Sequence, residues 1–205
     1  MMSSIKTISP ELILETDKVI LRPVDRNDFE SFLQLAKEDE DMWIYFTLNL
    51  GDENQLAKWM DMAFADKNAG TRRPFTIIDK KKNKIAGSSS MGNIAYHDLR
   101  LEIGWSWLGK NSRGTGINRH AKFCMMNYAF GELNFERVEF KTDFLNERAK
   151  QGLRKVGGKE EGVLRSHMTM WNNRRRDSVY FAVLKNEWPR LKETTFNDID
   201  GYEFH

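Results

Sequence analysis

The length and the balanced charge of this chain narrow the classes of protein to which it can belong. Its 205 residues suffice for one sizeable core and are too few for two full domains to be the default. Hydrophobic residues make up 40% of the chain and charged residues 30%, yet the formal net charge is only +2. We therefore expect a folded globular protein, and the charge argues against dedicated nucleic-acid binding, which usually requires a strong basic excess.

Cysteine content and hydropathy indicate the compartment. The single cysteine, Cys124, cannot form an intramolecular disulfide, so nothing points to an oxidising environment. Residues 1–17 lack the basic start and the continuous apolar stretch of a signal peptide, and no run approaches 18 apolar residues. We expect a soluble cytoplasmic protein without a membrane span.

Apolar periodicity predicts a mixture of strands and helices. In chain order the expected elements are strand 18–23, a helix around 29–35, helix 52–70, strand 74–78, a strand from 85 onward, strand 101–108, helix 117–130, strand 137–142, helix 146–156, strand 163–170 and strand 178–184. About seven strands and four helices in this order indicate an α+β fold with a mixed sheet. The helix at 117–130 follows the fourth strand, so this is not the opening βαβ unit of a Rossmann domain. Residues 1–191 form one predicted domain, and residues 192–205 have the composition of a polar tail.

The most informative segment joins the strand at 101–108 to the helix at 117–130. It places Gly114 and Gly116 in a Gly-x-Gly turn just before the helix begins. Such a turn presents a row of backbone N–H groups and the positive end of the helix dipole to an anion. Glycine permits positive φ and the close approach of a ligand to the backbone. The segment therefore predicts a site for a phosphate or pyrophosphate group.

Several segments with distinctive residue patterns follow one another along most of the chain. They are Val-Ile-Leu-Arg-Pro-Val at 19–24, Glu-Ile-Gly-Trp at 102–105, Arg-Gly-Thr-Gly-Ile-Asn at 113–118, and the segments 137–143, 146–148, 162–165 and 176–180. Together they resemble the GNAT family of N-acetyltransferases, and within it the branch of the ribosomal-protein N-terminal acetyltransferases. The resemblance covers residues 14–188. It implies a single-domain GNAT fold, two strands splayed at a cofactor cleft, and acetyl transfer from acetyl-CoA directly to an amine.

The resemblance also implies which residues contact the cofactor. In the family, the pyrophosphate of acetyl-CoA is held by a row of backbone amides in the glycine loop. The matching residues here are Arg113, Gly114, Thr115, Gly116, Ile117 and Asn118. In the family, the pantetheine arm pairs with the splayed end of the preceding strand, here Trp107 and Leu108. It also forms a hydrogen bond with the family residue that Asn146 matches. Asn146 could equally cap the helix that it begins, and the two roles are compatible.

Two positions depart from the family pattern. Asn111 stands where Gln or Arg is usual, which costs little if backbone amides hold the phosphates. Ala149 stands where relatives often carry a serine whose hydroxyl can protonate the departing thiolate. The general acid therefore stays open: another donor or water protonates the thiolate, or its protonation is not rate-limiting.

Glu102 is the candidate general base. An amine in water is mostly protonated at neutral pH, so a base acting directly or through water is useful. Strict alternation would place Glu102 on one face with Gly104 and Ser106, opposite Trp105 and Trp107, and leave room beside its carboxylate. The matching family position is frequently a glutamate with this role. The alternative is a strand glutamate that faces solvent or pairs with an arginine.

Other reactive side chains have simpler explanations. Cys124 lies in an apolar helix without an adjacent base, so we expect a small buried hydrophobe rather than a nucleophile. The four histidines show no paired ligand spacing, and we expect no metal site. Arg174, Arg175 and Arg176 are expected at a solvated hairpin tip, with contact to an acidic substrate or the 3′-phosphate of CoA as the alternative.

The sequence is compatible with three functions from different classes. The first is an acetyl-CoA-dependent N-acetyltransferase acting on a primary amine, either a protein N-terminus or a small molecule. The second is a CoA-binding relative without turnover, for which Ala149 is the only sign. The third, a ribosome- or RNA-associated protein, rests on the arginine run alone and is disfavoured by the net charge. Homodimers are common in the resembled branch, but no segment identifies an interface, the acceptor or the length of the acyl group.

Overall fold

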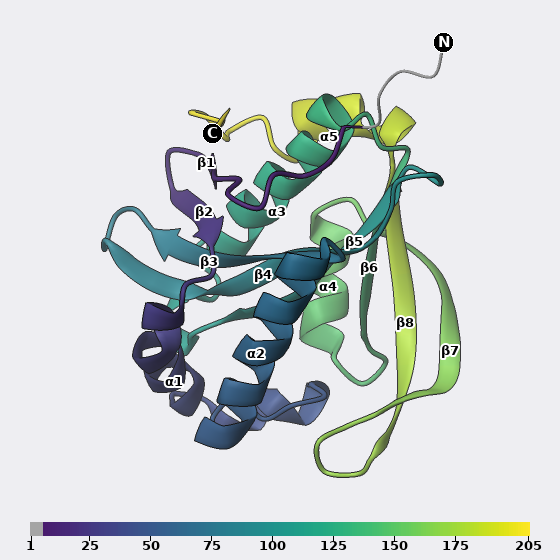
Figure 1. The fold of residues 1–205 in the computed structure, drawn as a ribbon. Helices are drawn as coiled ribbons and strands as arrows, with labels where there is room; N and C mark the ends of the chain where they lie inside the picture. The colour runs from purple at the N-terminus through teal and green to yellow at the C-terminus, as the bar shows by residue number, and fades with distance from the viewer. Residues whose placement is uncertain (1–5) are drawn as a thin grey trace.

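A mixed sheet of nine strands forms the centre of the computed structural model, which describes residues 6–205 (Figure 1). The strands are β1 (Leu14–Glu15), β2 (Val19–Pro23), β3 (Arg72–Asp79), β4 (Lys84–Ala95), β5 (Arg100–Leu108), β6 (Arg137–Asp143), β7 (Lys159–Thr169), β8 (Arg175–Leu184) and β9 (Glu203–Phe204). Their order across the sheet is β7-β8-β6-β5-β4-β3-β2-β1-β9. All neighbours are antiparallel except β5 and β6, which run parallel.

Helices cover both faces of the sheet. They are α1 (Phe29–Lys37), α2 (Glu53–Ala69), α3 (Ile117–Asn127), α4 (Glu147–Lys155) and α5 (Trp188–Thr194). In Figure 1, α1 and α2 lie in front of the sheet and α3 and α4 lie behind it. The predicted α+β fold is confirmed, and the part of the chain that the structure describes adds β1, β9 and α5 to the seven strands and four helices expected.

The helix ends form at the residues that the sequence indicates. The Asp52 side chain accepts a hydrogen bond from the backbone N–H of Gln55 at the start of α2, at 2.9 Å. Gly70 ends the same helix in the left-handed region, with φ 75°. Asp25 closes a capping box over the short turn that leads into α1.

Two apolar cores lie on opposite faces of the sheet. The larger core joins α3 to β5 and β6 through residues such as Ile103, Cys124 and Phe140. The smaller core joins α1 and α2 to the front face around Phe32, and Trp107 is the residue of β5 that belongs to it. These cores fix which side of the sheet each helix occupies and therefore position the loops between them.

Residues 192–205, expected as a polar tail, are part of the fold. Strand β9 pairs with β1, and Phe196 is buried against Phe123 and Trp188. The Arg119 side chain donates to the Thr195 carbonyl and pairs with Asp198, which ties this segment to α3. Residues 1–5 of the predicted 1–191 domain lie outside the described residues.

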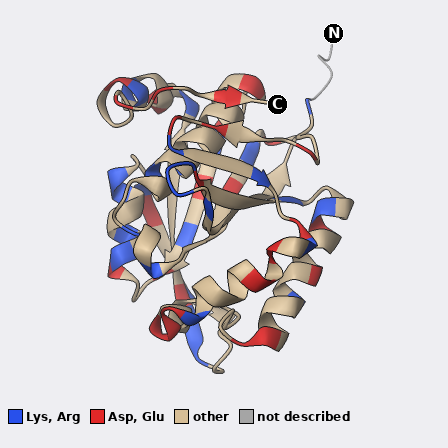
Figure 2. Ribbon diagram, turned by 90° about the vertical axis from the view of Figure 1, so that its left-hand side faces the viewer, with Lys and Arg blue, Asp and Glu red and all other residues tan. Residues whose placement is uncertain are grey.

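Neither sign of charge dominates along the chain. Figure 2 shows Lys and Arg interspersed with Asp and Glu along the helices and loops, in keeping with the formal net charge of +2. Among the described residues, no helix has the length and apolar character needed to cross a membrane.

Candidate active site

Strands β5 and β6 pair at one end and separate at the other. They are hydrogen-bonded only where Arg100–Glu102 lies beside Arg137–Glu139. Beyond that point β5 stays with β4 as far as Leu108, whereas β6 stays with β8 as far as Asp143. Glu102 is therefore the last β5 residue in the pair and stands at the vertex of a V-shaped opening. This divergence confirms the splayed strands, and Trp107 and Leu108 lie on the β5 arm.

The glycine loop at the end of β5 leaves a row of backbone donors free. Gly114 and Gly116 have φ of 74° and 93°, in the left-handed region that favours glycine. The amides of residues 114–119 donate to no acceptor within residues 6–205, while that of Arg113 donates to the Lys110 carbonyl at 3.4 Å. The free row thus begins at Gly114 and continues into the first turn of α3. An anion is the ligand that such a row and the helix dipole favour.

Arg113 anchors the loop instead of pointing into it. Its Nε donates to the Leu108 carbonyl at 2.9 Å, and its guanidinium pairs with Asp39. Asp39 precedes the short 3₁₀ turn Glu40–Tyr45, so the contact joins the glycine loop to the segment between α1 and α2. The contact lowers the pKa of the Asp39 carboxyl, because the guanidinium donates to it and carries the opposite charge.

Asn146 has the capping role that the sequence left open. Its side chain accepts a hydrogen bond from the backbone N–H of Ala149 at 3.0 Å and begins α4. The residue is buried at the end of β6, on the other arm of the opening. A contact of Asn146 with the pantetheine arm remains a prediction.

The expected alternation along β5 fails at Trp105. Ser90 of β4 pairs with Gly104 and Ser88 pairs with Trp107, so two residues of β5 oppose one of β4 and form a β-bulge. Trp105 itself has φ 51°. The bulge changes the faces of every residue that follows it.

The expected faces of β5 are therefore wrong after Gly104. Trp107 enters the front core, and the Ser106 hydroxyl instead lies 2.7 Å from that of Ser89. Trp105 lies over the Gly92 backbone, where an added Cβ would come within 2.5 Å of the indole, and Gly92 pairs with Glu102. Both tryptophans consequently share the face of Glu102, and Ser106 does not.

Glu102 has one fixed oxygen and one open oxygen. Its Oε2 accepts hydrogen bonds from Asn93 Nδ2 at 2.7 Å and from Lys141 Nζ at 3.0 Å. Its Oε1 lies beside Gly104, where an added Cβ would be 2.7 Å away. Oε1 has no hydrogen-bond partner among the described residues and still contacts solvent, although the residue is only 3% exposed. Glu102 therefore has a cationic partner, as in the alternative expected from the sequence, but that partner is Lys141 and not an arginine. Its open oxygen, Oε1, can still accept a proton.

The model of the GNAT acetyltransferase domain matches residues 18–159, which is more than half of the chain. The chain belongs to the GNAT family. It is an N-acetyltransferase by that membership, and the resemblance of its motifs to this family is confirmed.

Similar proteins include members of the expected branch. YdaF of Bacillus subtilis, provisionally named a ribosomal N-acetyltransferase, is 28% identical over 156 residues, covering 69% of this chain and 84% of YdaF. RimJ of Mycobacterium smegmatis, solved in complex with CoA-disulfide, shares the fold with a TM-score of 0.78 at 20% identity. The match covers 94% of this chain and 97% of RimJ. A GCN5-related N-acetyltransferase of Brucella melitensis superposes with a TM-score of 0.82 at 24% identity, covering 90% of this chain and 84% of that one.

The arginine run of this acetyltransferase is only partly solvated. Arg174 pairs with the buried Asp143 and donates to the Ile44 carbonyl at 2.9 Å. Arg176 is 7% exposed, and Arg175 is the only one of the three arginines that is exposed. The expectation of a solvated hairpin tip is therefore wrong for two of the three residues. Strand β8 begins at Arg175, and the side chains of a strand alternate between the two faces of the sheet. Arg176 therefore lies on the same face as Glu102.

The β7–β8 hairpin closes over the front of the acetyltransferase. Trp171 Nε1 donates to the Trp43 carbonyl at 2.9 Å, next to the contact that Arg174 makes with Ile44. Trp43 is fully buried in the front core. The backbone carbonyls of Trp43 and Ile44 thus hold the hairpin, a long-range contact without a local signal in the sequence.

Cys124 lies within the core behind the sheet. It is buried in α3, and desolvation raises the pKa of its thiol. A protonated thiol in an apolar setting is a poor nucleophile, which fits the expected packing role.

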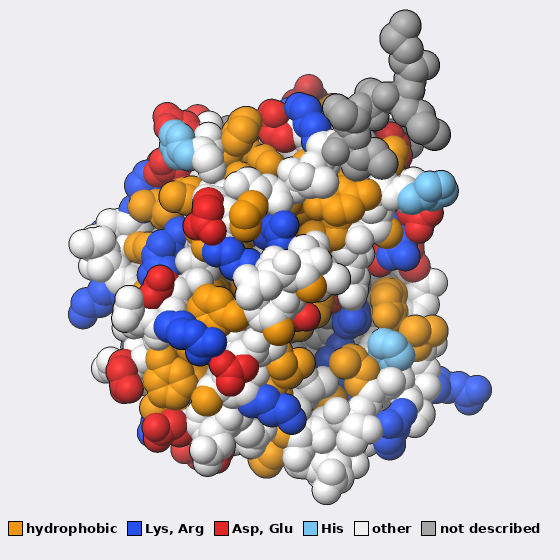
Figure 3. Space-filling model, in the orientation of Figure 1, with side chains coloured by type: hydrophobic (Ala, Val, Ile, Leu, Met, Phe, Trp, Pro, Cys, Tyr) orange, Lys and Arg blue, Asp and Glu red, His pale blue; other side chains and the backbone are white. Residues whose placement is uncertain are grey.

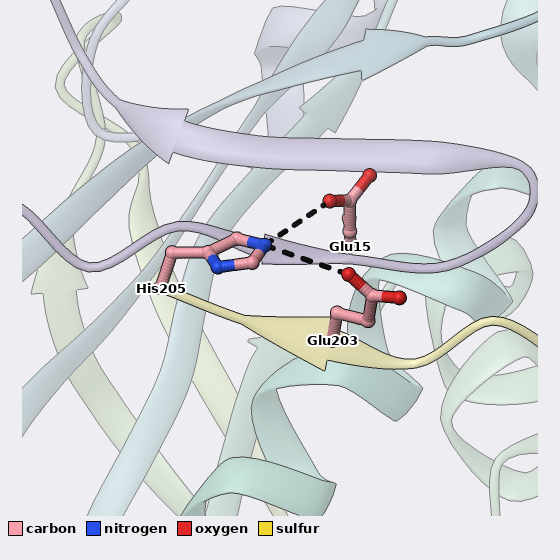
Figure 4. A group of neighbouring side chains, drawn as sticks. All are labelled: Glu15, Glu203 and His205. Carbon is pink, nitrogen blue, oxygen red and sulfur yellow. Dashed lines mark ion pairs between the residues drawn. The ribbon is translucent and has the colours of Figure 1, made fainter.

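One group of side chains has the types of metal ligands. His205 Nε2 lies 3.5 Å from Glu15 Oε1 and 3.6 Å from Glu203 Oε2, at the sheet edge formed by β1 and β9 (Figure 4). Lys80 Nζ is 2.7 Å from the second oxygen of Glu15 and already supplies a positive charge there. The group is an ion-pair cluster in which Glu203 and His205 are exposed and Glu15 is half-buried, and it lies at the β9 end of the sheet, away from the opening between β5 and β6.

Proposed function

We propose that this acetyltransferase transfers an acetyl group from acetyl-CoA to a primary amine, and that Glu102 accepts the proton that the amine loses. The observation that carries the proposal is the open Oε1 of Glu102 at the vertex where β5 and β6 separate. The two arms of this opening lead from the glycine loop and from α4 toward that oxygen.

The chain offers suitable groups for CoA. The free amides of residues 114–119 suit the pyrophosphate, because they combine N–H donors with the positive end of α3. The unpaired edge of β5 near Trp107 and Leu108, and the side chain of Asn146, suit the amide groups of the pantetheine arm. The CoA complex of the related RimJ supports the choice of CoA as the carrier.

Acetyl-CoA supplies a thioester, and the residues of this chain position the amine and its proton. As the amine nitrogen forms a bond to the carbonyl carbon, the C–S bond breaks and the nitrogen proton passes to Glu102 Oε1, directly or through water. Lys141 and Asn93 hold Oε2, so the carboxylate keeps one orientation. Ala149 has no hydroxyl, so the leaving thiolate takes its proton from another donor or from water.

The acceptor is a protein N-terminus or a small-molecule amine, and the resemblance to YdaF, which is provisionally named a ribosomal N-acetyltransferase, favours an amine of a ribosomal protein. Release of the CoA thiol, measured with a panel of N-terminally free peptides and simple amines, tests the proposal. Amine-dependent thiol release with formation of the acetylated amine is the expected result. Saturable binding of acetyl-CoA without amine-dependent release would instead support the CoA-binding relative without turnover.

A further inference from the structure

Arg176 is a buried arginine without a hydrogen-bond or ion-pair partner in residues 6–205. It is 7% exposed, and its Nε is shielded from solvent without an acceptor. Nη1 and Nη2 also form no hydrogen bond with the described residues, but they retain contact with solvent. Burial lowers the pKa of this guanidinium, whereas the carboxylates of Asp143 and Glu102 act in the opposite direction. An unpaired buried cation is costly, so its retention calls for an anion that the protein itself does not supply.

The neighbouring charges are already matched to one another. Glu102 pairs with Lys141 at 3.0 Å, and Asp143 pairs with Arg174. Once these pairs are formed, both nearby carboxylates have a cation in contact. Arg176 keeps an uncompensated positive charge.

Arg176 faces the side of the sheet on which Glu102 lies. In strand register Lys141 pairs with Tyr180 and Asp143 pairs with Ser178, and Arg176 is the next residue of β8 on that face. Trp105 packs beside Lys141 on the same face, with Nζ 5.9 Å from the ring centroid. Figure 3 shows this region as a hollow between α2 and the β7–β8 hairpin, with blue Lys and Arg atoms at its floor.

The pyrophosphate of CoA has a different place in the proposed complex. The free amides of residues 114–119 begin α3, which packs on the opposite face of the sheet. Arg176 lies on the front face, where α1 and α2 form the second core. The anion that reaches Arg176 therefore belongs to the acceptor.

We propose that Arg176 binds a carboxylate of the acceptor, so that this enzyme acetylates amines that carry an acidic group. A guanidinium offers parallel N–H donors that match a carboxylate, and the two solvent-reachable nitrogens are the ones that form such a pair. The inference rests on the proposed function, because it places the amine at Glu102 and the carboxylate across the hollow at Arg176.

The test compares acidic acceptors with neutral ones of the same shape. The probes are tetrapeptide amides with a free N-terminus whose second residue is glutamate or glutamine, and free glutamate and glutamine as the small-molecule arm. The variants are Arg176→Gln, Arg176→Lys and the control Arg175→Gln. Arg175 is adjacent in sequence but exposed, and it donates to Ser166 and Thr169.

The wild-type enzyme should have a kcat/KM about 10- to 100-fold higher for the acidic member of at least one pair, the range for a charge-assisted hydrogen bond. Arg176→Gln should remove that preference, so that the acidic acceptor loses about 10- to 100-fold more in kcat/KM than the neutral one, while acetyl-CoA affinity is retained. Arg176→Lys should restore part of it, and Arg175→Gln should keep all of it. A preference in the peptide pair indicates a peptide acceptor, and a preference between free glutamate and glutamine indicates a small-molecule acceptor.

Equal rates for acidic and neutral acceptors of the wild type would overturn the inference. So would an equal loss for both acceptors, or weaker acetyl-CoA binding, in Arg176→Gln. If no amine is acetylated, the proposed function fails, and calorimetry with the CoA-saturated protein still tests Arg176. Acidic peptide that binds the wild type about 10-fold better than Arg176→Gln would support the carboxylate site. Equal affinity for the two proteins would refute it.

Discussion

The glycine loop and the proposed acceptor face are built in different ways. The loop offers backbone amides, from one continuous segment that begins at Gly114. The acceptor face consists of side chains from separate strands, among them Glu102 of β5, Lys141 of β6 and Arg176 of β8. A backbone site needs glycine and a helix start, whereas a side-chain site needs the sheet to be in register.

The two parts should therefore fail independently. A change in the loop should affect the binding of acetyl-CoA, because the free amides are the groups that suit its phosphates. A change at Glu102 should affect the proton transfer, because its carboxylate lies at the vertex of the strands and not in the loop. Substitutions in each part, compared with the same two measurements, can separate them.

The largest effect is expected for Glu102→Gln. The amide keeps the shape of the carboxylate but cannot accept the amine proton, so turnover should fall by about 10²- to 10⁴-fold, the usual contribution of a general base. The limb of the pH–rate profile that depends on this base should disappear. Binding of acetyl-CoA, measured by calorimetry, should stay unchanged.

Glu139→Gln is the matched control for Glu102→Gln. Glu139 is the direct partner of Glu102 in strand register and is also held in an ion pair, with Arg137 at 2.9 Å. It should retain turnover within a few-fold. A Glu102→Gln enzyme with the wild-type rate and pH profile would remove Glu102 from the mechanism.

Gly114→Val should have the reverse effect and weaken acetyl-CoA binding by about 100-fold. Apart from Gly114 and its two chain neighbours, no atom of the described residues lies within 4 Å of the position that a Cβ would take, so the added side chain should meet the proposed ligand rather than the fold. The φ of 74° also strains a β-branched residue. In the wild type, acetyl-CoA at 100 times its dissociation constant should add about 2.7 kcal/mol to the free energy of unfolding, and the variant should lose most of this gain.

Gly131→Val controls for the added bulk, because a Cβ at Gly131 also has open space around it and the residue is not among those with positive φ. Thermal unfolding with and without acetyl-CoA should show the normal shift in this control. An equal shift in Gly114→Val would show that the loop is not the phosphate site.

Gly104→Ala should lower kcat by about 10-fold, and it tests whether Oε1 of Glu102 is the oxygen that accepts the proton. The new methyl group would lie 2.7 Å from Glu102 Oε1, so the carboxylate must turn or the oxygen becomes blocked. Displacements of about 1 Å at a reacting group can cost up to 100-fold. Acetyl-CoA binding should not change, and Gly152→Ala, with open space at its Cβ, is the control. A variant with unaltered kcat would indicate that protons leave by another route.

Local signals explain what the sequence predicted. Asp52 and Gly70 cap α2 through contacts within a few residues, and Gly114 fixes the backbone of its own turn. The sequence therefore predicts the glycine loop and most helices and strands. The bulge at Trp105 was not, because it depends on how β5 pairs with β4. Strand β9 was missed for the same reason, since it joins β1 from the other end of the chain.

The acceptor face was the least predictable part of the site. The sequence predicts a role for Glu102 but does not indicate its partners Lys141 and Asn93, which come from neighbouring strands. Arg174 and Arg176 were read as a solvated charge run, the usual outcome for consecutive basic residues. Their burial follows from the start of β8 and from Asp143, and neither is visible in the arginine run itself.

The smallest effect is expected at Cys124, on the helix that the glycine loop begins. Burial raises the pKa of its thiol, so the thiolate that reacts with iodoacetamide is scarce in the folded enzyme. Treatment at neutral pH should leave turnover and acetyl-CoA binding unchanged, while the protein unfolded in urea should be alkylated at this one cysteine. Mass spectrometry of the two samples makes the comparison. Alkylation of the folded enzyme with loss of turnover would show that Cys124 is reachable from the site, and the division between a backbone loop and a side-chain face would then be incomplete.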